Sequence, residues 1–378
     1  MPSALLAGHF GPTDAGETAT LGAFERALPD WTPVLASSDP AASGAAHGCR
    51  TVDARRPLAL VRAAARADAS VLAGWSIGED GGARPGLRAA VALVAAAKLR
   101  GRPTALLGIS ARGGRSAWEG RLSRRLLGGA DLVVLRDEVS ARHLEAAGVP
   151  GPFRIGTDPA WLDVQDRRAD GGVCNHPPPA GVNADAGPRP RRVVVAIEAR
   201  GCPAGLIARL GEALAALAAA GVEIALQPWG TTAGDGRDHG VVAELAGRIG
   251  RPVQVLEPLP DLGAGSAATG AVVALGSHAL IAAAAAGVPA VAVACEPAIA
   301  DLARRLDQPL VPADASVVAV RAAIAAALDR EPALPNAVEG QIATAEEGFR
   351  LLRVLLSEGR SDEVTELSGL PLRRGPQR

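Results

Sequence analysis

The sequence contains no tyrosine, and aromatic residues make up only 2% of its 378 residues. Platforms that stack nucleic-acid bases or sugar rings are built from aromatic side chains, so an extensive platform of this kind is not expected. An excess of charge of one sign is missing as well, because the formal net charge is −1. The chain therefore has no bulk field that would attract nucleic acid or an anionic membrane.

Long hydrophobic runs are also absent. Glycine, proline or a charged residue interrupts every apolar stretch before it reaches the length of a membrane span. The amino terminus, MPSALLAGHFG, lacks a basic region, and its apolar run is too short for a signal peptide. We therefore expect a soluble, cytoplasmic protein without a transmembrane segment.

Cysteine is scarce. The four cysteines are Cys49, Cys174, Cys202 and Cys295, and none of them forms a C-x-x-C pair. A chain of this size can bury a core without a disulfide scaffold, so we expect no disulfide framework. Cys174 and His176 lie close in sequence, but two ligands in a flexible loop do not make a metal site. No metal site is predicted.

Residues 269–307 have the pattern of a parallel α/β unit. Apolar runs at 271–275 and 288–294 predict buried strands, and each is followed by residues that open a helix. Open α/β sheets bind ligands at the carboxyl ends of their strands, so both turns are candidates for a site. The helix that opens at His278, with Ser277 ready to cap it, offers backbone N–H groups and a positive dipole end to an anion.

This stretch, GSHALIAAAAAGVPAVAVACEPAIADL, resembles the carboxyl-terminal signature of the polysaccharide pyruvyl transferase family. That signature is an Arg-Leu-His-Ala turn, a small-residue helix, Gly-Val-Pro, a strand, and Tyr-Asp-Pro-Lys. His278 and Pro297 match it. Gly276 stands where the family has arginine, and Ala298 stands where it has lysine.

The resemblance implies an α/β fold of two Rossmann-like domains that face each other across a cleft, as in the glycosyltransferase B arrangement. The length also suits two domains. We expect the first domain over residues 1–165, a flexible linker or insertion over 166–191, and the second domain over 192–335. A helix over 336–357 is expected to cross back to the first domain, and residues 358–378 to form a mobile tail.

Glycine-rich turns follow two strands of the first domain. The loop with Gly8 and Gly11 resembles the family's amino-terminal Gly-aromatic-aromatic-Gly loop. The turn over residues 74–80 partly matches the family's Gly-Gly-Gly-x-Leu turn and contributes Gly74. The resemblance assigns substrate binding to Gly8, Gly11 and Gly74, whereas tight turn geometry is an equally good account of these glycines.

Two polar motifs follow later strands. Arg136 opens the family's Arg-Asp-x-x-Ser turn, in which Asp137 is expected to cap the next helix. Arg136 has no such local duty, so we predict that it binds substrate. Asp158, in an Asp-Pro motif that the family shares, is a second candidate, and the alternative for it is a turn or capping role.

The second domain adds candidates around His278. Arg200 follows the first strand of this domain, which often ends with an arginine in the family. Ser277 precedes His278, and Glu296 keeps the carboxylate of the family's Tyr-Asp pair. We predict substrate-binding roles for Arg200, Ser277 and Glu296.

The resemblance also implies a reaction. Family members transfer the enolpyruvyl group of phosphoenolpyruvate to two sugar hydroxyls, which gives a pyruvate ketal and phosphate. The donor anion needs cations and helix amino ends, and Arg136 would hold its phosphate or carboxylate. His278 is the best general acid or base, because histidine titrates near neutrality. A histidine that is merely packed at a helix start is the alternative.

The expected partners follow from this chemistry. They are phosphoenolpyruvate and a glycan or lipid-linked sugar acceptor that belongs to a cell-surface polysaccharide or its precursor. The chemistry needs no metal or organic cofactor, and nucleic acid is not expected to bind. The sequence leaves a homo-oligomer open.

The departures at Gly276 and Ala298 weaken the expected donor site. Each missing charged hydrogen bond costs about 1.5–3 kcal/mol, and two together cost about a hundredfold to ten-thousandfold in rate if nothing replaces them. Two alternatives therefore stay open: a nucleotide-sugar glycosyltransferase of similar plan, and a binding relative that has lost catalysis. The arginines that could replace the missing cations are Arg112, Arg115, Arg200, Arg304 and Arg305.

Overall fold

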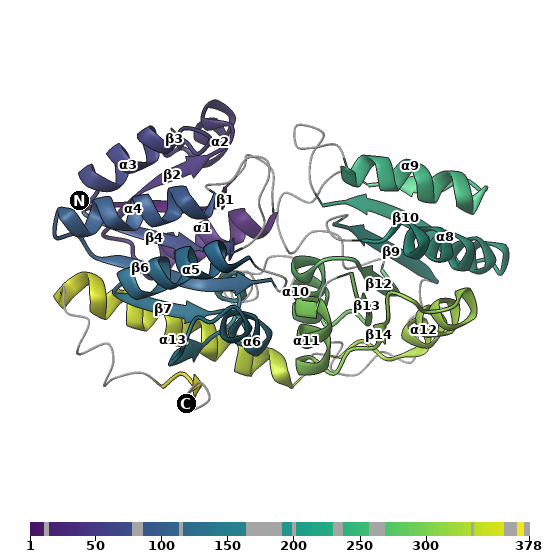
Figure 1. Cartoon of the computed structure of the whole chain (residues 1–378). Helices are drawn as coiled ribbons and strands as arrows, with labels where there is room; N and C mark the ends of the chain where they lie inside the picture. The colour runs from purple at the N-terminus through teal and green to yellow at the C-terminus, as the bar shows by residue number, and fades with distance from the viewer. Residues whose placement is uncertain are drawn as a thin grey trace. The chain divides into compact units, whose positions relative to one another are not determined.

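The chain divides into two compact units, which are described separately here. The first comprises Met1–Asp163 with Gln341–Arg378, and the second comprises Val164–Gly340. The computed structural model (Figure 1) describes residues 1–10, 15–77, 86–112, 116–163, 191–198, 202–229, 237–256, 269–295, 297–333, 336–358 and 369–373. Residues 166–190 of the predicted linker lie outside these ranges.

The first unit is built on one sheet with strand order β15-β8-β7-β6-β4-β1-β2-β3, and β5 pairs with β6 beside this path. Every pairing is parallel except that of β15 with β8. The strands are β1 (Ser3–Phe10), β2 (Thr32–Ser37), β3 (Arg50–Asp53), β4 (Ala69–Ala73), β5 (Ser76–Ile77), β6 (Thr104–Ala111), β7 (Leu132–Leu135), β8 (Phe153–Ile155) and β15 (Leu372–Arg373).

Helices cover both faces of this sheet (Figure 1). Side chains alternate along β1, so Leu5 packs in one core cluster with α3 and α4 and Leu6 packs in the other with α1 and α13. The helices are α1 (Ala15–Ala27), α2 (Pro40–His47), α3 (Pro57–Arg66), α4 (Leu87–Leu99), α5 (Ala117–Gly129), α6 (Glu138–Ala146) and α13 (Ala337–Glu358).

Part of the expected mobile tail is ordered, because Leu372–Arg373 form the edge strand β15. The backbone N–H of Ile155 donates to Pro371 O at 2.9 Å. Arg373 donates to both carboxylate oxygens of Glu145, at 2.9 and 3.0 Å, and also to Glu138. These bonds, first those to Glu145 and then that to Glu138, raise the pKa of Arg373 further above its ordinary value.

Glu347 on α13 joins the helix to the segment before β15. It accepts from Arg350 Nε at 2.6 Å and from the backbone N–H of Gly369 at 2.7 Å. The hydrogen bond from Arg350, with that from Gly369, lowers the pKa of Glu347 although burial opposes the shift. A lowered carboxyl pKa contributes stability above the ordinary value of 4.5, and this stability is lost as the pH falls through the folded-state value.

We therefore expect Glu347→Gln to lower the free energy of unfolding by about 1 kcal/mol at pH 7 and by much less near pH 3. Chemical denaturation at both pH values measures the difference. Glu212 is exposed on α8 in the second unit, so Glu212→Gln is the control for the change in net charge. An equal loss at both pH values would contradict the assignment.

The second unit has a parallel sheet with strand order β11-β10-β9-β12-β13-β14. Counted in chain order this is 3-2-1-4-5-6, the Rossmann order. Its elements are β9 (Arg192–Ile197), α8 (Ala204–Ala219), β10 (Glu223–Pro228), α9 (Arg237–Ile249), β11 (Gln254–Val255), β12 (Ala271–Ala274), α10 (Ser277–Ala285), β13 (Ala290–Val293), α11 (Pro297–Arg305), β14 (Leu310–Val311) and α12 (Val317–Asp329).

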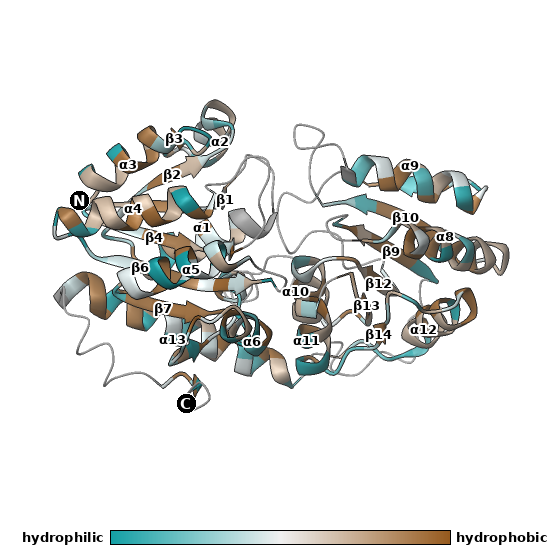
Figure 2. Cartoon of the chain, in the orientation of Figure 1, coloured by the Kyte–Doolittle hydropathy of each residue, from teal (hydrophilic) through white to brown (hydrophobic). Residues whose placement is uncertain are grey.

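In the second unit, alternate residues of the central strand β9 point into one apolar core. Val193, Val195 and Ile197 pack in one apolar cluster with residues of α8, α9 and α12. The strands of both units are largely brown in Figure 2, the colour of hydrophobic residues, as expected for sheets that are covered on both faces. The predicted α/β class with parallel sheets is confirmed. Within the described ranges, no helix is both long and apolar enough to cross a membrane.

Candidate functional site

Each sheet has one point at which the strand order changes direction. In the first unit it lies between β1 and β4, and in the second between β9 and β12. Ligands of open α/β sheets bind in the crevice beyond the carboxyl ends of the strands at such a switch point. The candidate residues are therefore placed relative to these two edges.

Gly8 and Gly74 both lie at the switch point of the first sheet. A Cβ on Gly8 would lie 2.4 Å from the carbonyl oxygen of Ala73, which explains why only glycine fits there. Gly74 follows β4 with a φ of 60°, in the left-handed region that favours glycine. The backbone geometry therefore explains why glycine stands at both positions. A role of the two glycines in substrate binding remains a prediction. Gly11 lies outside the described residues.

Arg136 ties together the carboxyl ends of several strands. Its Nε donates to Gly108 O at 3.3 Å, and its Nη2 donates to Gly74 O at 3.1 Å. Its Nη1 lies 3.3 Å from Asp158 Oδ2, and the two side chains are 15% and 5% exposed. Asp158 Oδ1 also accepts from the backbone N–H of Ala160 at 3.0 Å. Three predicted site residues, Gly74, Arg136 and Asp158, are therefore in one network, and Arg136 has a local duty that the sequence did not reveal.

The start of α6 is fixed to the end of β6 beside this network. Asp137 caps the helix as predicted, accepting from the N–H of Ser140 at 2.7 Å. Ser140 Oγ accepts from the N–H of Ala111 at 3.0 Å, and His143 Nδ1 lies 2.8 Å from Ala111 O. His143 therefore helps to fix the start of α6 to the end of β6.

In the second unit, Gly276 and Glu198 lie side by side at the switch point. Continuing the register Ala274↔Ala196 by two residues aligns Gly276 with Glu198, which directly follows β9. A Cβ built on Gly276 would lie 1.7 Å from Glu198 Oε2, 2.5 Å from Cδ and 2.6 Å from Cβ. The carboxyl group of Glu198 thus fills the space in which the side chain of residue 276 would begin. Sequence reasoning missed Glu198, although its place directly after an apolar strand was a usable signal.

His278 lies in the first turn of α10, half-buried, with its Nδ1 atom buried. Gly276 holds the N-cap position, and α10 begins at Ser277. The expectation that Ser277 caps this helix is therefore wrong by one residue, and Gly276 supplies no side-chain cap hydrogen bond. Arg200 and Glu296 lie outside the described residues, so their predicted roles stay predictions.

A disulfide bond joins Cys202 to Cys295, with a Cα–Cα distance of 4.7 Å. The expectation of no disulfide is wrong for this pair. Cys202 follows β9 and Cys295 follows β13, on the two strands that flank β12. The bond therefore ties the two loops on either side of the β12–α10 turn. Sequence spacing could not reveal the pair, because 93 residues separate the two cysteines.

Two of the suggested replacement arginines are excluded by topology. Arg304 and Arg305 both pair with Asp301, each at 3.2 Å, in the last turns of α11. The amino end of α11 lies at the carboxyl edge of the sheet, so its last turn lies toward the opposite edge. Arg112 lies at the carboxyl edge of the first sheet, where its N–H donates to Ile77 O. Arg115 and Arg200 are outside the described residues.

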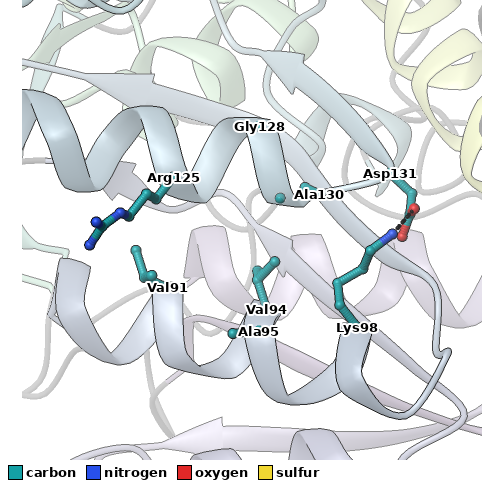
Figure 3. A pocket seen from close by; sticks show the side chains of 9 residues that line it. Val91, Val94, Ala95, Lys98, Arg125, Gly128, Ala130 and Asp131 are labelled. Carbon is teal, nitrogen blue, oxygen red and sulfur yellow. Dashed lines mark hydrogen bonds and ion pairs between the residues drawn. The ribbon is translucent and has the colours of Figure 1, made fainter.

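A cavity of about 560 Å³ lies away from both switch points, between α4 and α5 of the first unit. Figure 3 shows Val91, Val94 and Ala95 of α4 along it, with Lys98 and Asp131 paired at one end. It contains none of the predicted site residues. In the described part of the chain, no group of three or more His, Cys, Asp or Glu could hold a metal ion.

Two sheets of Rossmann order define the class of the protein, and solved structures of the glycosyltransferase B kind share its fold. HepE from Anabaena, in complex with UDP and glucose, matches with a TM-score of 0.58 and 14% identity, over 97% of this chain and 100% of that one. UDP-GlcNAc 2-epimerase from Neisseria meningitidis, bound to UDP-GlcNAc, matches with a TM-score of 0.60 and 9% identity, over 94% and 100%. At these identities the likeness concerns the fold alone.

The family comparison is more specific. The model of the polysaccharide pyruvyl transferase family matches residues 19–200, and this confirms the resemblance for that part of the chain. The match contains the turn at Arg136 and the Asp-Pro motif at Asp158, but not residues 269–307. A comparison with curated proteins gave no match.

Proposed function

We propose that the protein is a transferase that modifies a sugar of a cell-surface polysaccharide or its precursor, with phosphoenolpyruvate as donor and with a diverged donor site. The family match over residues 19–200 carries this proposal. The buried Arg136–Asp158 network supports it, because the family motifs there are built into one carboxyl edge rather than scattered over the surface.

His278 is the proposed general acid or base. The methylene carbon of the enolpyruvyl group must gain a proton, and the attacking sugar hydroxyl must lose one. An imidazole can do either near neutral pH. The contacts of Arg136 within the described residues use three of its five N–H donors. We propose that the remaining donors contact the anionic donor substrate.

Calorimetric titration of phosphoenolpyruvate at low salt tests the donor assignment. We expect saturable binding by the wild type. Once an acceptor is added, His278→Gln should lower the rate of phosphate release by about a hundredfold or more, because a general acid or base is lost. His239→Gln, a histidine in the first turn of α9 in the same unit, is the matched control and should bind as the wild type does. Phosphate release on adding glycan acceptors would then identify the acceptor. Absence of binding at millimolar phosphoenolpyruvate would exclude pyruvyl transfer.

Nucleotide-sugar transfer is the second candidate. The observation that favours it is the fold that this chain shares with HepE, which was solved in complex with UDP and glucose. Titration with UDP and with UDP-glucose separates this candidate from the first, because only nucleotide-sugar transfer predicts saturable binding of both.

A further inference from the structure

Glu198 lies on the face of the second sheet opposite the apolar cluster of α8, α9 and α12. Val193, Val195 and Ile197 of β9 point into the cluster with α8, α9 and α12. Because side chains alternate along a strand, the even-numbered residues of β9 point to the other face, and Glu198 continues that set. That is the face on which Glu198 meets Gly276, at the start of α10.

The carboxyl group of Glu198 and any side chain at position 276 exclude each other. A Cβ at 276 would overlap not only the mobile carboxyl end of Glu198 but also its Cβ, at 2.6 Å. A rotation of the Glu198 side chain cannot remove the second overlap, because Cβ is fixed by the backbone. Glu198 therefore occupies the space in which the side chain of the family motif's arginine would begin, so an acidic residue stands there in place of a basic one.

This reversal changes which ligand the edge can hold. A phosphate beside the amino end of a helix is normally stabilised by backbone N–H groups and the helix dipole. A carboxylate in contact with the amino end of the helix is itself stabilised by the helix dipole. It repels a second anion, such as a phosphate, from the same place. Hydroxyl groups suffer no such repulsion, and they can donate to the carboxylate while accepting from N–H donors.

We propose that Glu198 is the specificity-determining residue of the second unit, and that it reserves the start of α10 for the hydroxyl groups of a sugar in place of a phosphate. The proposal rests on the proposed function, of which it names the substrate class at this edge. His278, one residue further along α10 than Ser277, then lies next to the sugar hydroxyl that must lose a proton. The phosphate of the donor is bound by other residues.

Two variants and one control test the proposal by calorimetry with inorganic phosphate and with phosphoenolpyruvate. Glu198→Gln keeps the size and an acceptor oxygen but removes the charge, and it should raise the affinity for both anions by about tenfold or more. The double variant Glu198→Gly with Gly276→Arg removes both the carboxyl group and the Cβ at position 198, restores the cation in the vacated space and should raise the affinity further. Glu244→Gln, an exposed change on α9, controls for net charge and should change neither affinity.

The sugar half of the proposal has its own readout. Saturation-transfer NMR with methyl glycosides of glucose, galactose and mannose should show contact with the wild type for at least one of them. The double variant should lose that contact. If Glu198 only capped α10, Glu198→Gln would change thermal stability and leave both anion affinities unchanged. Unchanged or lower anion affinity in Glu198→Gln overturns the proposal, and so does a wild type that contacts none of the three glycosides.

These outcomes are separable from failure of the proposed function. A wild type that neither binds phosphoenolpyruvate nor releases phosphate from it, while Glu198→Gln gains affinity for inorganic phosphate, removes pyruvyl transfer and leaves the role of Glu198 standing. A wild type that turns over phosphoenolpyruvate, with anion affinities that Glu198→Gln does not change, removes the role of Glu198 and leaves the function standing.

Discussion

Arg136→Met is expected to lower the free energy of unfolding of the first unit by about 3–5 kcal/mol. The change leaves the Asp158 carboxylate, 5% exposed, without its cationic partner. It also removes the donors to the carbonyl oxygens of Gly74 and Gly108. Breaking one side of a buried ion pair costs more than the pair contributes, because an uncompensated charge stays buried.

Denaturant unfolding followed by tryptophan fluorescence measures this loss, since Trp75 and Trp161 are buried in the first unit. Arg142→Met, an exposed change on α6, is the control and should cost less than about 0.5 kcal/mol. The double variant Arg136→Met with Asp158→Asn should lose less than the sum of the two single changes. A loss below about 1 kcal/mol for Arg136→Met would contradict a structural role for this network.

Removal of the disulfide is expected to have the second-largest effect. Replacing Cys202 and Cys295 together by serine should lower the free energy of unfolding of the second unit by about 2–4 kcal/mol. The bond closes a long loop, with a sequence separation of 93 residues, and a long closed loop restricts the unfolded chain most. The loops after β9 and β13 would also lose the tie beside the β12–α10 turn.

Thermal unfolding with and without a thiol reductant gives the same comparison on the wild-type chain. Thiol titration of the denatured protein should find two fewer reactive thiols before reduction than after it. Cys49→Ser is the matched control, because Cys49 is a free cysteine. Equal transition temperatures in the two conditions, together with equal thiol counts, would show that the pair is not bonded. A reducing cytoplasm keeps such pairs as thiols, so both forms should be measured.

The arrangement of the sheets was predictable because it depends on local patterns. Apolar runs such as Val193–Ile197 can be buried only as central strands, and the alternation of strand and helix then requires parallel pairing. Asp137 as the cap of α6 followed from its place before a helical pattern. The sequence therefore predicted the class of fold. The edges at which a site would lie stay a prediction.

The contacts within those edges were not predictable, because they join residues that are far apart in sequence. Arg136 meets Gly74 across 62 residues and Gly108 across 28, and nothing local to Arg136 indicates either partner. The Cys202–Cys295 bond and the approach of Glu198 to Gly276 depend equally on strand order. A sequence motif indicated at which strand end each side chain would lie. It did not indicate which residues that side chain would contact.

The mutual exclusion at positions 198 and 276 couples the two positions for any later substitution. With Glu198 in its present place, a Cβ on residue 276 would lie 2.6 Å from Glu198 Cβ, so only glycine fits there. A change of Gly276 to arginine therefore requires a coordinated change at position 198.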